Sequence, residues 1–209
     1  MNQNDQYRRA MEVLRDGGVV ALPTDTVFGL AAVATDRAAV QRVLDIKGRD
    51  AANPMPLFVG SVEQAALVAQ ITAPARVLAA RFWPGALTIV VPKRPEFDTA
   101  AVSGETVGLR VPADPVLREM AAQLGPLTGT SANRSGAPAA RTAAEARAAL
   151  NGDVDLIVDA SLPATGVAST VVDCTDEDAV RIVREGAVAR ADIERALAGV
   201  ANVVPVGMS

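Results

Sequence analysis

Four polar segments of the sequence each follow or end an apolar run, where a folded chain would present them at the ends of strands or helices. They are Thr24-Asp25-Thr26, Lys47-Gly48-Arg49 with Asn53, Ser131-Ala132-Asn133, and Ser169-Thr170. Each has an ordinary structural explanation by itself: a helix cap, a charge at a helix C-terminus, a turn or the start of a strand. Together they supply cations, hydroxyls and an amide. That composition predicts a pocket for an anionic ligand, such as a nucleotide phosphate beside a carboxylate.

Arg110 adds a further cation in an unusual setting. It lies between Leu109 and Val111, in a segment that otherwise reads as a buried strand. Burying a guanidinium without a partner is very costly. Arg110 is therefore expected either to face solvent or to have a fixed anionic partner or ligand. Arg184, near the end of another predicted strand, is a second candidate of the same kind.

The composition excludes several kinds of chemistry. The 209 residues include no histidine, so no Ser-His-Asp triad, no histidine general base and no histidine-ligated zinc site is possible. Cys174 is the single cysteine, which excludes an intramolecular disulfide and a multi-cysteine metal site. Neither a GxxxxGK[ST] phosphate loop nor a GxGxxG dinucleotide motif is present. Any chemistry must use carboxylates, hydroxyls, Lys, Arg and a bound metal ion.

The charge and hydropathy of the chain suggest where it works. The formal net charge is -4 and the sequence pI is about 4.9. This argues against a general nucleic-acid coat, although it leaves room for a local basic pocket. No apolar run approaches the roughly 18 residues that a membrane-spanning helix needs, and the polar N-terminus does not resemble a signal peptide. We expect a cytoplasmic protein without membrane contact.

Periodicity and capping signals predict seven helices and eight strands to position these groups. The expected helices are 5–15, one that begins at Thr35 or Asp36 and runs to about 48, 62–69, 72–82, 115–124, 142–150 and 191–198. The expected strands are 19–22, 54–59, 86–91, 107–111, 127–130, 156–159, 169–174 and 179–183. The segment 27–30 should return to the core, and the residues after Gly199 read as a tail.

The irregular alternation of helices and strands predicts an α/β fold of the α+β-like kind. We expect one twisted sheet of mixed parallel and antiparallel strands, flanked by helices. No repeat, linker or composition change marks a domain boundary, so residues 1–209 are interpreted as a single domain with its core at about 8–198.

Seven segments, in this order, resemble the YrdC/TsaC family of L-threonylcarbamoyladenylate synthases. They are PTDTVFGL (23–30), KGR and NP (47–54), FWPGALTIVV (82–91), VGLRVP (107–112), TSANRSG (130–136), STVVD (169–173) and IVREG (182–186). The resemblance extends from about Gly17 to Gly186. It implies a single YrdC-like domain with a concave ligand cavity, without the C-terminal Rossmann-like extension of some longer members.

The resemblance also implies an activity, that of a nucleotidyltransferase in tRNA processing. L-threonine, bicarbonate and ATP would give threonylcarbamoyl-AMP and pyrophosphate, with Mg²⁺ bound through the ATP phosphates and no protein metal ligand. The product would pass to a downstream complex that transfers the threonylcarbamoyl group to an adenosine of tRNA. Direct contact with tRNA or another RNA is a further possibility.

Site residues follow from the same resemblance. The catalytic set would be Lys47, Arg49, Ser131 and Asn133. L-threonine would contact Thr26, Phe28, Arg110 and Ser169. ATP would contact Lys47, Arg49, Asn53, Thr106, Ser131, Asn133 and Arg184.

The sequence departs from the family pattern at three places around the expected threonine contacts. Phe28 stands where many members have Tyr, Ala139 stands where Ser is frequent, and no histidine follows the NP step. These departures put the threonine contacts in question more than the ATP contacts.

Two other functions remain as alternatives. One is a non-catalytic RNA-binding or ribosome-associated YrdC-like module, against which the acidic pI and the intact Lys-Arg-Ser-Asn set weigh. The other is the YrdC-like carbamoyl-transfer domain of hydrogenase maturation proteins. Those proteins carry zinc-finger segments, which a single cysteine does not allow here.

Overall fold

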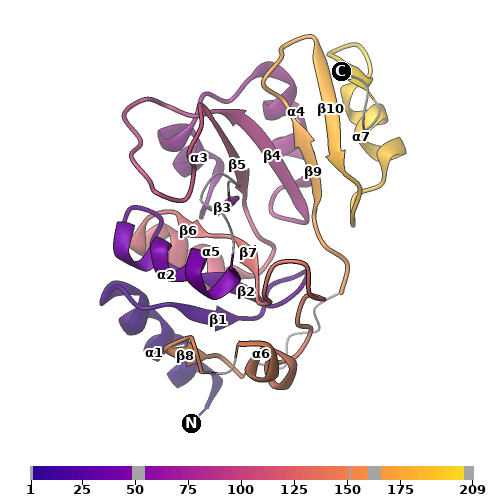
Figure 1. The fold of residues 1–209 in the computed structure, drawn as a ribbon. Helices are drawn as coiled ribbons and strands as arrows, with labels where there is room; N and C mark the ends of the chain where they lie inside the picture. The colour runs from indigo at the N-terminus through magenta and orange to yellow at the C-terminus, as the bar shows by residue number, and fades with distance from the viewer. Residues whose placement is uncertain (1, 49–54, 151, 160–165, 205–209) are drawn as a thin grey trace.

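The computed structural model describes residues 2–48, 55–150, 152–159 and 166–204. These residues form two β-sheets with helices around them (Figure 1). The helices are α1 (Gln3–Arg15), α2 (Arg37–Lys47), α3 (Val62–Val68), α4 (Ala73–Phe82), α5 (Pro115–Leu124), α6 (Ala143–Leu150) and α7 (Arg190–Leu197). None of these helices combines the length and the hydropathy of a bilayer-spanning segment.

The larger sheet has seven strands in the order β11-β10-β9-β4-β5-β3-β6. They are β3 (Leu57–Phe58), β4 (Leu87–Pro92), β5 (Thr106–Arg110), β6 (Leu127–Thr128), β9 (Thr170–Asp173), β10 (Ala179–Arg184) and β11 (Asn202–Val204). The pairs β4–β5, β9–β10 and β3–β6 are antiparallel, whereas β4–β9, β3–β5 and β10–β11 are parallel. The sheet is therefore mixed, as the sequence predicts.

The smaller sheet has four strands in the order β7-β2-β1-β8. They are β1 (Val20–Leu22), β2 (Gly29–Ala31), β7 (Thr130–Ser131) and β8 (Leu156–Ile157). β1 and β2 form an antiparallel hairpin whose loop carries Thr24, Asp25 and Thr26. In Figure 1 this sheet lies below the larger one, near α1 and α6.

The chain crosses from one sheet to the other at Gly129. β6 pairs with β3 of the larger sheet, and β7 pairs with β2 of the smaller one. Between them, the Gly129 N–H donates to the Pro56 carbonyl at 2.7 Å. A Cβ atom at Gly129 would lie 3.1 Å from that oxygen and 3.3 Å from the Phe58 ring, which leaves little room for a side chain. Gly129 is thus the one residue between a strand of the larger sheet and a strand of the smaller sheet at this point of the chain.

Helix starts are fixed by capping side chains that the sequence makes visible. Asp36 accepts hydrogen bonds from the Ala38 and Ala39 N–H groups at the start of α2. The other side chains that accept from backbone N–H groups of the first turn are Asn2, Ser61, Thr72, Asp114 and Thr142. α2 ends at Gly48, whose φ of 57° is the left-handed conformation that glycine adopts easily. This cap fixes Lys47 as the last residue of the helix.

Side-chain alternation along the strands decides which residues lie in the hydrophobic core and which face a cavity. On β5, Val107 and Leu109 are in the hydrophobic core, while Thr106, Gly108 and Arg110 face a cavity. On β4, Leu87, Ile89 and Val91 are likewise in the core, and Thr88 and Val90 face the cavity. One face of the larger sheet is thus core, and the other is one wall of the cavity.

The predicted fold class is confirmed, and most helix bounds agree within two residues. The prediction of a single sheet was wrong, because strand 127–130 divides at Gly129 and its two halves pair in different sheets. The prediction of a tail after Gly199 was also wrong. Asn202–Val204 forms β11, which is too short and too weakly apolar to predict from its pattern and depends on pairing with β10. That residues 1–209 form a single domain stays a prediction.

We predict that Gly186→Ala destabilises the fold, whereas Gly104→Ala does not. A Cβ at Gly186 would lie 2.3 Å from the Ala168 carbonyl oxygen and 2.6 Å from backbone atoms of Ser169 and Thr170. The backbone must move, which costs about 1–3 kcal/mol. Gly104 has no atom within 4 Å of the added Cβ, so its substitution should change the free energy of unfolding by less than about 1 kcal/mol. Urea unfolding of both variants measures the difference, and equal stabilities would contradict the prediction.

Candidate functional site

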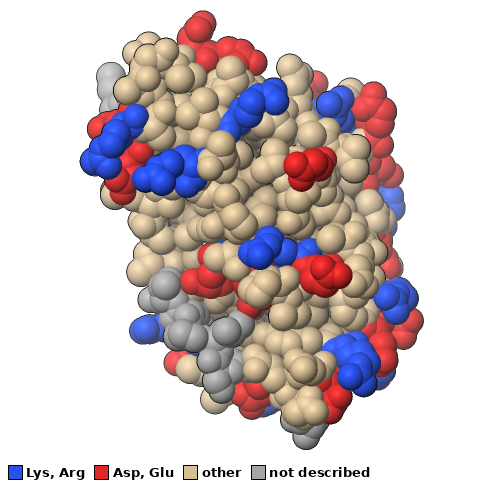
Figure 2. All heavy atoms as spheres, turned by 180° about the vertical axis from the view of Figure 1, so that it is seen from behind, with Lys and Arg blue, Asp and Glu red and all other residues tan. Residues whose placement is uncertain are grey.

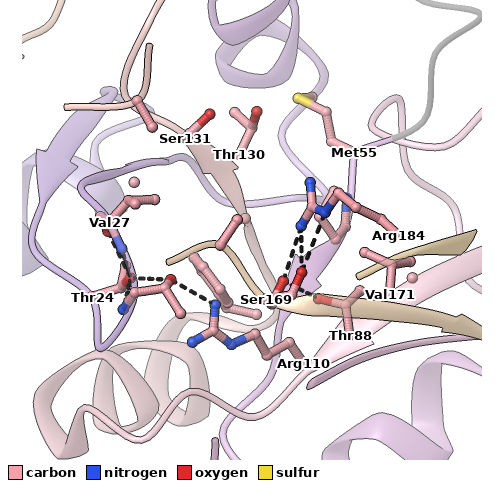
Figure 3. Close-up of a pocket in the computed structure, with 18 of the residues that line it drawn as sticks. Thr24, Val27, Met55, Thr88, Arg110, Thr130, Ser131, Ser169, Val171 and Arg184 are labelled. Carbon is pink, nitrogen blue, oxygen red and sulfur yellow. Dashed lines mark hydrogen bonds between the residues drawn. The ribbon is translucent and has the colours of Figure 1, made fainter. Parts of the chain in front are cut away.

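A cavity of about 650 Å³ lies between the two sheets. One wall is the face of the larger sheet that carries Thr88, Arg110 and Val171. The opposite wall comes from the β1–β2 hairpin loop, from β7 and from the end of α2. Figure 3 shows this arrangement, with Thr130 and Ser131 across the cavity from Arg110, Thr88 and Ser169. The polar groups that the sequence separates by more than 100 residues therefore line one space.

Lys47, Ser131 and Asn133 are in direct contact on one side of the cavity. The Lys47 ammonium donates to the Ser131 carbonyl at 2.7 Å and to the Asn133 Oδ1 at 2.8 Å. The Ser131 hydroxyl also donates to Asn133 Oδ1, and the Asn133 amide donates to the Ala137 carbonyl. Lys47 is only 3% exposed, although it is the last residue of a helix. These contacts hold a buried positive charge at the cavity wall, as an anion site requires.

Arg110 and Thr26 meet on the opposite side. The Arg110 Nη1 donates to the Thr26 hydroxyl at 3.0 Å, and its Nε donates to the Gly85 carbonyl at 2.9 Å. Its Nη2 lies 2.5 Å from the Asp25 carboxylate. The Phe58 ring lies 5.7 Å from the guanidinium carbon, within cation–π range. Arg110 is buried, so it needs a fixed anionic partner, and that partner is Asp25.

Ser169 and Arg184 form a third group. The Arg184 Nη2 donates to the Ser169 carbonyl at 2.8 Å and to its hydroxyl at 3.2 Å. The Ser169 hydroxyl lies 2.9 Å from the buried Thr88 hydroxyl, which also lines the cavity. Among the described residues no carboxylate forms an ion pair with Arg184. Its charge is therefore available to a ligand.

The two arginines of the cavity influence one another. Burial lowers the pKa of the Arg110 guanidinium, the Asp25 carboxylate opposes that change, and the positive charge of Arg184 lowers it further. Burial also lowers the pKa of Arg184. Both guanidinium groups nevertheless remain protonated at neutral pH, because arginine does not lose its proton in proteins. An anion in the cavity would relieve the repulsion between them.

The structure brings together most of the predicted site residues, with three qualifications. Thr106 lines the cavity with an exposed side chain at its edge. Arg49 and Asn53 lie outside the described residues. Phe28 does not line the cavity: it is 1% exposed and belongs to the hydrophobic core. Val27 and Gly29 line the cavity instead, so the alternation of the chain turns Phe28 to the other side.

Sequence reasoning missed several residues of the site. Asp25 was recognised as polar but given no role, although a buried arginine on a strand signals that a nearby carboxylate must exist. Thr88 is a hydroxyl in an otherwise apolar strand, which was a usable signal. Phe58 and the Gly85 carbonyl gave no signal, because their contacts with Arg110 depend on the tertiary fold alone.

The Sua5/YciO/YrdC family model, described as telomere recombination, matches residues 12–186. The threonylcarbamoyl-AMP synthase of Pyrococcus abyssi is 37% identical over 195 residues, and that of Bacillus subtilis is 36% identical over 202. These alignments cover 92% and 93% of this chain. The chain spans 57% of the length of each of these two relatives. A putative threonylcarbamoyl-AMP synthase of Mycobacterium leprae is 42% identical over 202 residues, which are 95% of this chain and 89% of the relative.

Solved structures give the same result. The crystal structure of P. abyssi Sua5 complexed with L-threonine superposes with a TM-score of 0.86 at 35% sequence identity, over 95% of this chain and 58% of that one. The crystal structure of E. coli YciO superposes with a TM-score of 0.78 at 26% identity, over 90% of this chain and 93% of that one. Sequence, fold and family model agree over nearly the whole length, and the chain belongs to the Sua5/YciO/YrdC family.

Proposed function

We propose that this protein is a threonylcarbamoyl-AMP synthase, which joins L-threonine, bicarbonate and ATP and releases pyrophosphate. The observation that carries the proposal is the cavity between the sheets, where the Lys47 group faces the Arg110 and Arg184 groups. The relatives named as threonylcarbamoyl-AMP synthases support it, as does the L-threonine complex of P. abyssi Sua5.

The Arg110 side of the cavity suits the amino acid. The contacts with Gly85, Thr26 and Asp25 use three of the five N–H groups of this guanidinium, so two remain for the α-carboxylate of L-threonine. Thr26, Ser169 and Thr88 supply hydroxyls nearby, which suit the side-chain hydroxyl of the substrate. A site built to bond that hydroxyl leaves unpaired polar groups when valine enters, which disfavours valine.

The Lys47 side suits the phosphates of ATP. Lys47, Ser131 and Asn133 provide a charge, a hydroxyl and an amide, and Thr106 and Arg184 line the same cavity. In the proposal Arg49 and Asn53, outside the described residues, complete this set. Lys47 and Arg184 would spread the negative charge that grows on the phosphates during transfer.

The reaction needs no histidine. The threonine amine attacks bicarbonate or CO₂ and becomes a carbamate, and bicarbonate loses water in this step. A carbamate oxygen then attacks the α-phosphorus of ATP. The bond between this phosphorus and the oxygen that bridges the α- and β-phosphates breaks, and pyrophosphate leaves with that oxygen. Close positioning of the carbamate and the nucleotide, with cations around the phosphates, supplies the rate enhancement without a protein nucleophile.

Magnesium would enter with the nucleotide. The described residues that line the cavity offer hydroxyls, carbonyls and one amide but no carboxylate, and no cluster of three acidic, His or Cys side chains occurs among the described residues. Such a donor set fits an ion held mainly by ATP phosphates and water. Bound there, Mg²⁺ would neutralise charge on the leaving pyrophosphate.

The product would be the donor for threonylcarbamoyl modification of a tRNA adenosine by a downstream transferase complex. In this proposal the protein acts in the cytoplasm, where ATP and tRNA are present.

Direct contact between the protein and RNA is a separate proposal. On the face shown in Figure 2, Lys and Arg side chains lie beside Asp and Glu side chains, and no broad basic patch forms there. That face gives no support to the alternative of an RNA-binding module.

Pyrophosphate release tests the activity directly. With ATP and Mg²⁺, we expect release that requires both L-threonine and bicarbonate, because the carbamate must form before it can attack the nucleotide. A coupled phosphate assay with each component omitted in turn measures this dependence. Release with ATP alone, or no release at all, would contradict the proposed function.

Lys47→Ala is expected to lower kcat/KM by more than tenfold, because one charge-assisted contact to a phosphate contributes about 1.4 kcal/mol or more. Lys93→Ala is the matched control. Lys93 donates to the Phe97 carbonyl and does not line the cavity, so its loss should leave kcat/KM within about twofold. Equal effects of the two substitutions would contradict the assignment of Lys47.

Arg110→Lys is expected to raise the KM for L-threonine by about tenfold or more while the KM for ATP changes little. Lysine keeps the charge but cannot offer two parallel N–H groups to a carboxylate. Initial rates with each substrate varied separately measure the two constants. A defect confined to ATP would argue against a role for Arg110 in amino-acid binding.

A further inference from the structure

Asp25 lies in the hairpin loop between two residues that line the cavity. Thr24 and Thr26 both face that space, whereas Asp25 is not among the lining residues. Its carboxylate nevertheless reaches Arg110, at 2.5 Å from Nη2. The Arg110 side chain is 5% exposed and that of Asp25 is 19% exposed. The contact is therefore largely desolvated, and it is made by a residue that does not line the cavity.

Among the described residues, the other groups in hydrogen-bond or ring contact with Arg110 are neutral. The Gly85 carbonyl accepts from Nε, and the Thr26 hydroxyl accepts from Nη1 (Figure 3). The Phe58 ring provides an apolar surface beside the guanidinium. Among the described residues, Asp25 is the only carboxylate within ion-pair distance of Arg110. Its charge therefore compensates the buried cation, while the position of its oxygen at Nη2 helps to fix the guanidinium plane.

The Thr24 and Thr26 hydroxyls of the loop hydrogen-bond to each other, which limits the hydrogen bonds that they can form with Arg110. The Thr24 hydroxyl donates to the Val27 carbonyl at 2.7 Å, so the proton shared between Thr24 and Thr26 must come from Thr26. Thr26 then accepts from Arg110 and donates to Thr24. This chain of bonds makes the loop rigid and places Asp25 and Thr26 on two different nitrogens of the same guanidinium.

With these contacts made, Arg110 keeps one N–H group on each terminal nitrogen. Resting on the function proposed above, we propose that Asp25 is a positioning residue for amino-acid binding. Its carboxylate sets the orientation in which Arg110 offers those two N–H groups to the α-carboxylate of the amino acid. Asp25 acts through Arg110 and touches neither substrate.

The test separates the position of the Asp25 oxygen from its charge. Asp25→Asn keeps an acceptor oxygen in the same place without the charge, and Asp25→Glu keeps the charge but moves it by one methylene. Isothermal titration with L-threonine gives Kd for each variant, and steady-state kinetics give the KM for L-threonine and for ATP. Asp98→Ala is the matched control, because it removes the carboxylate of an exposed Arg37–Asp98 pair outside the cavity.

If position matters, Asp25→Glu weakens L-threonine binding about tenfold or more, while Asp25→Asn stays within about threefold of the wild type. In both variants the KM for ATP stays within about twofold, and Asp98→Ala behaves as the wild type. The melting temperature of Asp25→Asn should fall, because Arg110 then lies buried without its charge partner, and added L-threonine should restore part of the loss.

Three results would overturn the inference alone: wild-type affinity in Asp25→Glu, a weaker affinity in Asp25→Asn than in Asp25→Glu, or equal rises in the two KM values. If Asp25→Asn does not fold, the affinity of Asp25→Glu decides. Failure of the wild-type protein to bind L-threonine would overturn the proposed function together with this inference.

Discussion

The buried guanidinium of Arg110 is the constraint on which the arrangement of the cavity depends. A positive charge at 4% exposure must be compensated, and the fold meets that need from three separate segments. The hairpin loop gives a carboxylate and a hydroxyl, the turn after α4 gives a carbonyl, and β3 gives an aromatic ring. These segments are brought to one place because β5 carries Arg110 on its cavity face while Leu109 anchors the strand in the core.

The walls of the whole cavity, like the position of Arg110, depend on core residues next to them in the sequence. Period-two alternation makes each strand part of both the core and the cavity wall, so the apolar residues that stabilise the fold also fix the polar ones that line the cavity. Lys47 is positioned in a comparable way by the end of a helix. The left-handed cap at Gly48 ends α2 where its last side chain can reach Ser131 and Asn133. Binding groups that are distant in the sequence thus gain precision from the packing beneath them.

Local signals in the sequence were sufficient to predict most helices and strands, but not how these elements assemble. Asp36, Ser61 and Asp114 mark helix starts because a cap is a contact within four residues. The split of 127–131 and the strand β11 depend on partners far along the chain, so no local pattern reveals them. That the segments of Lys47, Ser131 and Asn133 share a pocket was predicted from their composition, whereas their catalytic roles came only from the family resemblance. The core position of Phe28 could not be predicted, because neither the resemblance nor the composition indicates which face of the loop turns inward.

The passage of the chain through Gly129 has a consequence for the size of ligand that the protein can take. Thr128 is paired with β3 and Thr130 with β2, so only Gly129 lies between a residue of one wall and a residue of the other along that edge. The walls cannot spread there without breaking strand pairing. In the proposed function, added bulk on a substrate analogue would therefore be accommodated toward the opposite rim.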